Sequence, residues 1–118
     1  MKKVFLLAVV LLAFSCQSND EIPEGIMSQE EMVSALIEIR MLEGQVASLT
    51  ISNDSSQILY HFLEKRLFDR IELDTAVYAK SYDYYMLHPE QYIEITSAVI
   101  DSLKLRSQKL SMPNSGTN

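Results

Sequence analysis

The chain has few side chains that could do chemistry, and the first of them is a single thiol. Cys16 is the sole cysteine among 118 residues, so no disulfide can form within the chain. An unbroken apolar run, residues 4–14, precedes it and follows two lysines. As a helix that run would be about 16 Å long, whereas a bilayer core is about 30 Å thick. The pattern is typical of a removable export signal rather than of a membrane span.

The residues just before Cys16 resemble a bacterial lipobox, where a lipid is attached to the thiol before the signal is cut. Ala13 and Ser15 also suit an ordinary signal peptidase, which would cut the same bond. A plain secreted product would carry one unpaired, exposed thiol, so we expect lipidation of Cys16 instead. The acidic pair Asp20 and Glu21 suits a solvated linker, and it also resembles a surface-export signal of lipoproteins. We therefore expect an anchor in the outer membrane, with the periplasmic or the surface-exposed face left open.

The remaining nucleophiles and possible metal ligands do not combine into a recognisable catalytic pattern. The sequence has no Gly-rich phosphate loop and no serine flanked by glycines at an elbow. His61 and Glu64 lie one helical turn apart, but no second His/Glu pair with that spacing could complete a metal site. We expect a non-enzymatic protein without metal or cofactor, and we expect His61 to be a surface or boundary residue.

Two charges interrupt otherwise apolar helical stripes. Glu43 and Arg66 each fall among aliphatic residues at spacings of three and four. Such a charge lies either at the edge of the stripe, with its head in water, or buried against a partner. The functional interpretation is a polar seam between two helices, in which Glu43 contacts Arg66 or another basic group. Arg40 is one turn before Glu43 and is available to join it.

Five tyrosines gather around His88 and Pro89, where one predicted helix ends and the next begins. Three of them share one helical stripe and predict core packing. Tyr84 lies off that stripe, so we expect its ring to face solvent beside helix-end carbonyls that lack partners. Ser81 is small enough for another helix to approach closely, with Tyr85 filling the space beside it. We expect His88 to cap the next helix or to fill the turn.

The element that positions the first stripe is a helix with a strong start signal. Ser28 and Glu31 form a capping box, and Met27 and Met32 stand at the positions of a hydrophobic staple. Gly44 weakens this helix and marks a possible close helix crossing. The apolar stripe that should face the core is Met32, Leu36, Ile39, Leu42, Val46 and Leu49, widened by Val33, Ile37 and Met41.

Three more helices follow in the predicted order. The second is capped by Asn53 or Asp54 and ends near residue 70. The third is capped by Asp74 and ends at His88, because the residue before a proline avoids the α region. The fourth starts at Pro89 and runs to about residue 110. Their inner faces are predicted to be Leu59, Phe62, Leu63 and Leu67, then Tyr78, Tyr82 and Tyr85, then Tyr92, Ile95, Val99 and Leu103.

The chain thus divides into four parts and is all-α. We predict a signal peptide in residues 1–15, a lipidated N-terminus and flexible tether in 16–26, one bundle of about four helices in 27–110, and a disordered tail in 111–118. Without the signal, eight Lys and Arg face sixteen Asp and Glu. That negative charge argues against binding to nucleic acid and against adsorption to acidic lipid.

Two blocks of the sequence resemble a known family. Residues 36–43, which include Glu38 and Arg40, resemble one block, and residues 81–85 followed by His88-Pro89-Glu90 resemble the next. The family is the domain-of-unknown-function family 4296 of small Bacteroidota lipoproteins. Arg40 stands where His or Tyr is common in it. The resemblance implies a helical envelope lipoprotein and assigns no activity.

From this sequence we expect a binding or accessory module for an envelope protein partner. The alternatives are a glycan-associated lipoprotein that uses the tyrosine cluster and a periplasmic, chaperone-like holder of extended polypeptide. The oligomeric state stays open. The candidate binding or polar-seam residues are Glu38, Arg40, Glu43, Arg66, Ser81, Tyr84, Tyr85 and His88.

Overall fold

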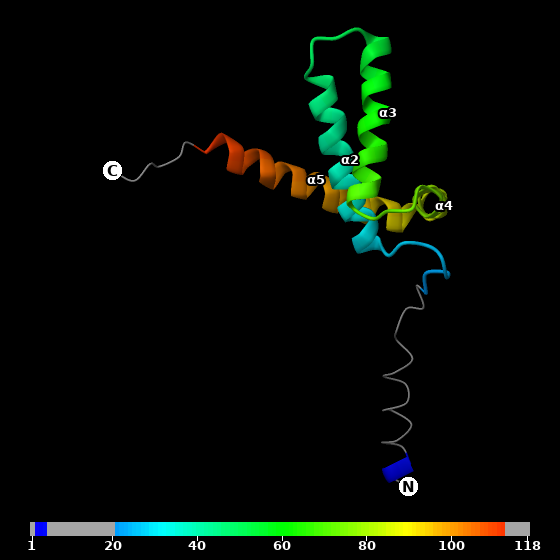
Figure 1. Ribbon diagram of the computed structural model, residues 1–118. Helices are drawn as coiled ribbons and strands as arrows, with labels where there is room; N and C mark the ends of the chain where they lie inside the picture. Colours follow the sequence, from blue (N-terminus) through cyan, green and yellow to red (C-terminus); the bar gives the residue numbers. More distant parts are fainter. Residues whose placement is uncertain (1, 5–20, 113–118) are drawn as a thin grey trace.

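The structure, a computed structural model, describes residues 2–4 and 21–112, and residues 21–112 contain helices and no strand. The helices are α2 (Gln29–Ala47), α3 (Asn53–Arg70), α4 (Thr75–Met86) and α5 (Pro89–Ser111). Helices α2 and α3 form an antiparallel hairpin, and α5 crosses the lower half of α2 at a steep angle, with α4 beside the crossing (Figure 1). The predicted all-α bundle is confirmed.

The start of α2 is as predicted, but its end is not. The Ser28 hydroxyl accepts a hydrogen bond from the Glu31 N–H at 3.1 Å, and the Glu31 carboxylate accepts one from the Ser28 N–H at 3.3 Å. The helix stops at Ala47, so Leu49, the last member of the predicted stripe, is 48% exposed. A Cβ at Gly44 would meet nothing within 4 Å, so the predicted close crossing there is wrong.

Helix α3 departs from the prediction at its cap and at its inner face. Its N-cap is Ser52, whose hydroxyl accepts a hydrogen bond from the Ser55 N–H, rather than Asn53 or Asp54. Phe62 is 57% exposed, whereas Phe68, which the stripe omitted, is buried. Phe68 lies near the end of α3, where it packs edge-on against Tyr78 of α4 at a centroid distance of 5.4 Å. The arrival of α4 therefore decides which phenylalanine is covered.

The starts of α4 and α5 match the sequence prediction, whereas α4 ends at Met86, two residues before the predicted His88. The Asp74 carboxylate accepts hydrogen bonds from the N–H groups of Ala76 and Val77 at 2.7 and 3.2 Å. Pro89 is the first residue of α5, where its missing N–H costs nothing. Ile95 and Val99 are buried and Leu103 is partly buried, as predicted for the inner face of α5.

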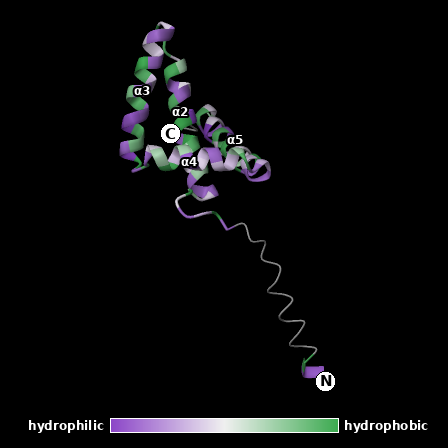
Figure 2. Ribbon diagram, turned by 90° about the vertical axis from the view of Figure 1, so that its right-hand side faces the viewer, coloured by the Kyte–Doolittle hydropathy of each residue, from purple (hydrophilic) through white to green (hydrophobic). Residues whose placement is uncertain are grey.

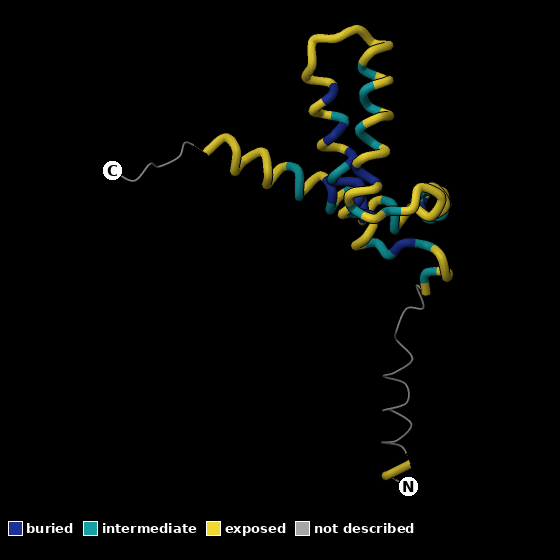
Figure 3. The backbone as a smooth tube through the Cα atoms, viewed as in Figure 1, coloured by how far each residue is buried: buried dark blue, intermediate teal, exposed yellow. Residues whose placement is uncertain are grey.

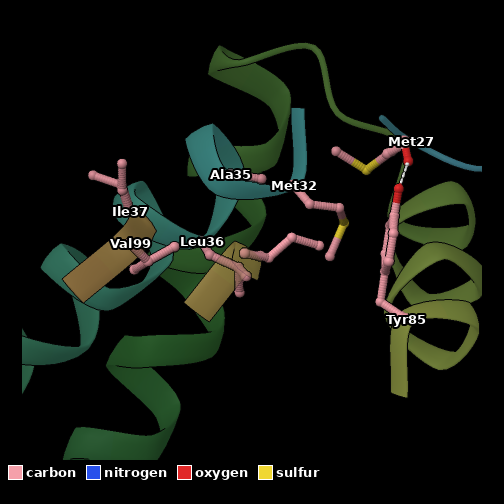
Figure 4. Packing of buried hydrophobic residues seen from close by; sticks show 8 residues of the cluster. Met27, Met32, Ala35, Leu36, Ile37, Tyr85 and Val99 are labelled. Carbon is pink, nitrogen blue, oxygen red and sulfur yellow. Dashed lines mark hydrogen bonds between the residues drawn. The ribbon is translucent and has the colours of Figure 1, made fainter. Parts of the chain in front are cut away.

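Two hydrophobic clusters meet along α2, which is the central helix of the domain. The first joins the N-terminal half of α2 to α4 and α5 (Figure 4); its buried members are Met27, Met32, Ala35, Leu36, Ile37, Tyr85, Ile95 and Val99. The second joins α2 to α3; its buried members are Ile39, Leu42, Val46, Leu67 and Phe68. Apolar and polar residues alternate along the hairpin (Figure 2), as expected for amphipathic helices with one covered face.

Several predicted segments fall outside the described residues. The signal peptide core, Cys16 and the tail from residue 113 onward belong to this group. The last part of the predicted tether is described, and its Ile26 packs against the first cluster, with its N–H bonded to the Pro23 carbonyl at 3.2 Å. The packed domain therefore begins before residue 27. Among the described helices, none has the length and apolar character needed to cross a bilayer.

Candidate binding site

The segment before α2 is held by two side chains of α4. Ser81 is fully buried; its hydroxyl accepts a hydrogen bond from the Met27 N–H at 2.8 Å and donates one to the Val77 carbonyl at 2.7 Å. The Tyr85 hydroxyl donates a hydrogen bond to the Met27 carbonyl at 2.6 Å (Figure 4). Both backbone polar groups of Met27 are thus satisfied by α4. We call Met27, Ser81 and Tyr85 the Met27 latch.

The Met27 latch changes the role that the sequence predicted for Ser81. The element that approaches Ser81 closely is the non-helical segment before α2, not another helix. A residue in such a segment has no helical partners for its N–H and C=O, so it needs side chains to bind them once it is buried. Tyr85 fills the core as predicted, with no exposed surface. Ser81 and Tyr85 therefore stabilise the fold and are unavailable to a ligand.

The predictions of a solvent-facing ring at Tyr84 and of free carbonyls beside it are both wrong. The Tyr84 ring is partly buried, stacked on the His88 ring at 4.1 Å and edge-on to Tyr85 at 5.1 Å. The Tyr84 carbonyl accepts hydrogen bonds from the Leu87 N–H at 3.1 Å and from His88 Nδ1 at 2.6 Å. His88 occupies the N-cap position of α5 without a side-chain cap bond. The His88 side chain instead hydrogen-bonds the Tyr84 carbonyl at the end of α4.

The predicted seam between Glu43 and Arg66 does not form. Glu43 pairs with Arg40 at 2.8 Å within α2, and the two side chains are 40% and 48% exposed. The Arg66 guanidinium lies over the exposed Phe62 ring at 5.3 Å. A charge at the edge of a stripe, the simpler of the two sequence interpretations, is therefore what the structure has at both positions. Glu38 pairs with Arg70 across α2 and α3 at 3.5 Å, on an exposed surface.

Arg40 and Glu43 instead line a pocket that three helices build together. Helix α2 contributes Arg40 and Glu43, and the pocket encloses about 180 Å³. A neighbouring depression of about 350 Å³ shares Glu64, Tyr78 and Tyr82 with it and adds Asp83 at its edge. We call the six polar residues of the smaller space the tyrosine pocket: Arg40, Glu43, Tyr60, Glu64, Tyr78 and Tyr82.

The tyrosines of this pocket are held in their neutral form. Burial raises the pKa of Tyr78 above its ordinary value. Burial, followed by the neighbouring Glu64 carboxylate, raises the pKa of Tyr60. The neighbouring Tyr92 hydroxyl and then burial raise the pKa of Tyr82. Each hydroxyl can therefore both donate and accept a hydrogen bond at neutral pH.

The pocket combines aromatic faces, hydroxyls and carboxylates in one small space. The Arg40 guanidinium, whose hydrogen bond to Glu43 raises its pKa, is the cation among the lining residues. Glu43 and Glu64 supply two carboxylates, so the lining carries one more negative charge than positive. Such a site can accept hydrogen bonds from a cationic or hydroxyl-rich group and stack its apolar part on a ring.

Sequence reasoning found only two members of this pocket. It missed Tyr60, Glu64, and the polar role of Tyr78 and Tyr82. The signal was present as two pairs at i, i+4 spacing, Tyr60 with Glu64 and Tyr78 with Tyr82, because residues four apart share one face of a helix. His61 is exposed, as expected, with its ring edge-on to Tyr60 at 5.7 Å. Within the described part of the chain, no three His, Cys, Asp or Glu side chains are grouped to hold a metal ion.

A family model described as a domain of unknown function (DUF4296) matches residues 23–109, a range that includes the Met27 latch and the tyrosine pocket. No curated protein matches the chain significantly, and no solved structure does.

Proposed function

Because the chain belongs to the DUF4296 family, a domain of unknown function, we propose a function for it from its sequence and its site. The protein is a lipid-anchored module of the cell envelope that binds a protein partner. The tyrosine pocket is the binding site, and it receives a basic side chain of that partner.

The anchor rests on Cys16 and the residues before it. A sole cysteine at the end of a short apolar signal is suited to lipidation, and two or more acyl chains give stable membrane attachment. Replacing the thiol by a hydroxyl, Cys16→Ser, should release the protein from membranes or block its processing. Membrane fractionation checks this result. A processed variant that still sediments with membranes as the parent does would refute the anchor.

The observation that carries the binding proposal is the charge balance of the tyrosine pocket. Arg40 is already paired with Glu43, which leaves the Glu64 carboxylate facing the pocket without a lining cation of its own. An incoming Lys or Arg would pair with Glu64 and lie against the faces of Tyr78 and Tyr82. Tyrosine and arginine are among the residue types that contribute most of the binding energy in protein interfaces.

A defined peptide series tests this proposal. Acetylated Gly-Lys-Gly, Gly-Arg-Gly and Gly-Gln-Gly peptides are titrated into the full-length protein held in nanodiscs. The basic peptides should bind and the Gln peptide should not, and Glu64→Gln should weaken binding about tenfold. The matched control is Glu94→Gln, an exposed position on α5 away from the pocket.

Two outcomes would refute the proposed site. Equal binding of all three peptides, or binding unchanged by Glu64→Gln, would show that the pocket does not bind a basic side chain selectively. Binding of neutral oligosaccharides that Glu64→Gln abolishes, with no binding of basic peptides, would replace the protein partner by a glycan.

A further inference from the structure

The C-terminal half of α5 leaves the body of the domain. Beyond the crossing with α2 it projects past the hairpin with its residues exposed (Figures 1 and 3). Its apolar side chains are among the most exposed in the described chain: Leu105 is 59% and Leu110 87% exposed, and Ile100 and Met112 are also exposed. These exposed residues give the helix end an apolar area that a partner could cover.

This half of the helix also differs from the rest of the chain in charge. After Asp101, α5 carries Lys104, Arg106 and Lys109 and no acidic residue. The chain as a whole has a net charge of −6. The projecting segment, residues 104–112, is therefore a basic, apolar helix end on an acidic protein. We call it the basic helix end.

A groove on the same molecule has the opposite character. It has a volume of about 880 Å³, within the range of about 300 to 1,000 Å³ found for ligand clefts, and lies between α2, the α3–α4 loop and the start of α4. Its apolar lining is Met27, Ala35, Ile37, Ile71, Leu73 and Val77, and its acidic lining is Glu30, Glu31, Glu38, Glu72 and Asp74. We call this space the acidic groove.

We propose that the acidic groove of one copy receives the basic helix end of a second copy, so that the protein forms a symmetric dimer. Apolar residues of the helix end would cover the apolar lining, while Lys104 and Lys109 would face the acidic rim. Each copy offers both surfaces, so two copies related by a two-fold axis would make the contact twice, and such an assembly would close at two.

The helix end of one copy reaches its own groove only through Arg106. Helix α5 is continuous from Pro89 to Ser111, so it has no hinge by which its end could turn back. Arg106 already lines the groove and donates a hydrogen bond to the Met41 sulfur, so within one copy the groove receives one cation against five acidic residues. A second molecule is therefore needed to fill the groove.

An anionic lipid surface is the other occupant that a basic, apolar helix end could meet. The acidic surface of the remaining chain would be repelled by such a membrane, and lipid would leave the acidic groove uncovered. Charge complementarity therefore favours a second copy. The inference is independent of the proposed function, because the acidic groove and the tyrosine pocket share no lining residue.

Charge reversal with mutual rescue tests the dimer. Full-length protein is produced with two different tags in the same cells, and co-purification of the two tags from solubilised membranes is measured. The helix variant, Lys104→Glu with Lys109→Glu, and the groove variant, Glu30→Lys with Glu72→Lys, should each lower co-purification about tenfold or more. Lys65→Glu and Glu94→Lys, both exposed elsewhere, are the matched controls and should change nothing.

Mixing the two variants is the decisive measurement. A mixed dimer has one unaltered contact and one contact with both charges reversed, so co-purification should return to near the parent level. Failure of the mixture to rescue, or no loss in either variant, overturns the proposal. Loss of binding to anionic vesicles in the helix variant, with co-purification unchanged, assigns the helix end to the membrane and also overturns it.

Discussion

Tyrosines of α4 build both the Met27 latch and the tyrosine pocket, yet the two regions differ in almost every physical property. In the latch, Tyr85 has no exposed surface, and its hydroxyl and that of Ser81 are bonded within the chain. In the pocket, Tyr78 and Tyr82 are partly exposed and line a space that the chain leaves open. Tyrosine thus stabilises the fold at the C-terminal end of α4 and lines an open pocket nearer its start.

Position along the helix axis explains this difference. Tyr78 and Tyr85 are seven residues apart, so they point in nearly the same direction but lie about 10 Å apart along α4. The segment before α2 passes over the Tyr85 end and covers it. The Tyr78 end lies against α3, which leaves the pocket between them. What covers each turn of α4 therefore decides its role.

Truncation of Tyr85 should have the largest effect on stability. Tyr85→Ala should lower the free energy of unfolding by about 3 to 5 kcal/mol, because it leaves a cavity in the first cluster and removes the donor to the Met27 carbonyl. Chemical denaturation followed by circular dichroism measures the change. A loss below about 1 kcal/mol would mean that the latch contributes no more than an exposed residue.

Removing only the hydroxyl of Ser81 should have a smaller effect. Ser81→Ala leaves the buried Met27 N–H without an acceptor and should cost about 1 to 3 kcal/mol. Ser97→Ala, at an exposed position on α5, is the control and should be nearly neutral. Equal stability of the two variants would show that the Met27 N–H does not depend on Ser81.

Four tyrosines have a raised pKa, and substitution of Tyr85 should isolate the contribution of the latch at alkaline pH. Burial, followed by the neighbouring Tyr84 and Glu31 charges, raises the pKa of Tyr85, so the folded state favours its neutral form. That contribution is fully present below the unfolded pKa of about 10 and is lost as pH rises through the folded pKa, by at most about 1.4 kcal/mol per pH unit. Denaturation between pH 9 and 11 should show a weaker pH dependence for Tyr85→Phe than for the parent.

The smallest effect is expected at the rim of the tyrosine pocket. Glu43 pairs with Arg40 on an exposed surface, so Glu43→Ala should change stability by less than about 1 kcal/mol. Thermal melts of the variant and the parent check this. A loss of 3 to 5 kcal/mol would instead mark a buried charge left without its partner.

Local signals in the sequence determined where α2, α4 and α5 begin. Ser28 with Glu31, Asp74 and Pro89 each act within one turn of the chain, so their effects need no knowledge of the fold. The stripe of α2 was predictable for the same reason, since its period alone places Leu36 and Val46 on one face. The all-α class followed from these elements together.

Contacts between elements were decided by the tertiary structure. The stripe of α3 does not say whether Phe62 or Phe68 is covered, because the answer depends on where α4 arrives. Charge alone could not choose a partner for Glu43, since Arg40 on its own helix is held nearby while Arg66 turns toward Phe62. Periodicity fixes the direction of a side chain from its own helix axis, whereas its partners depend on how whole helices cross, and that is set by packing across the entire domain.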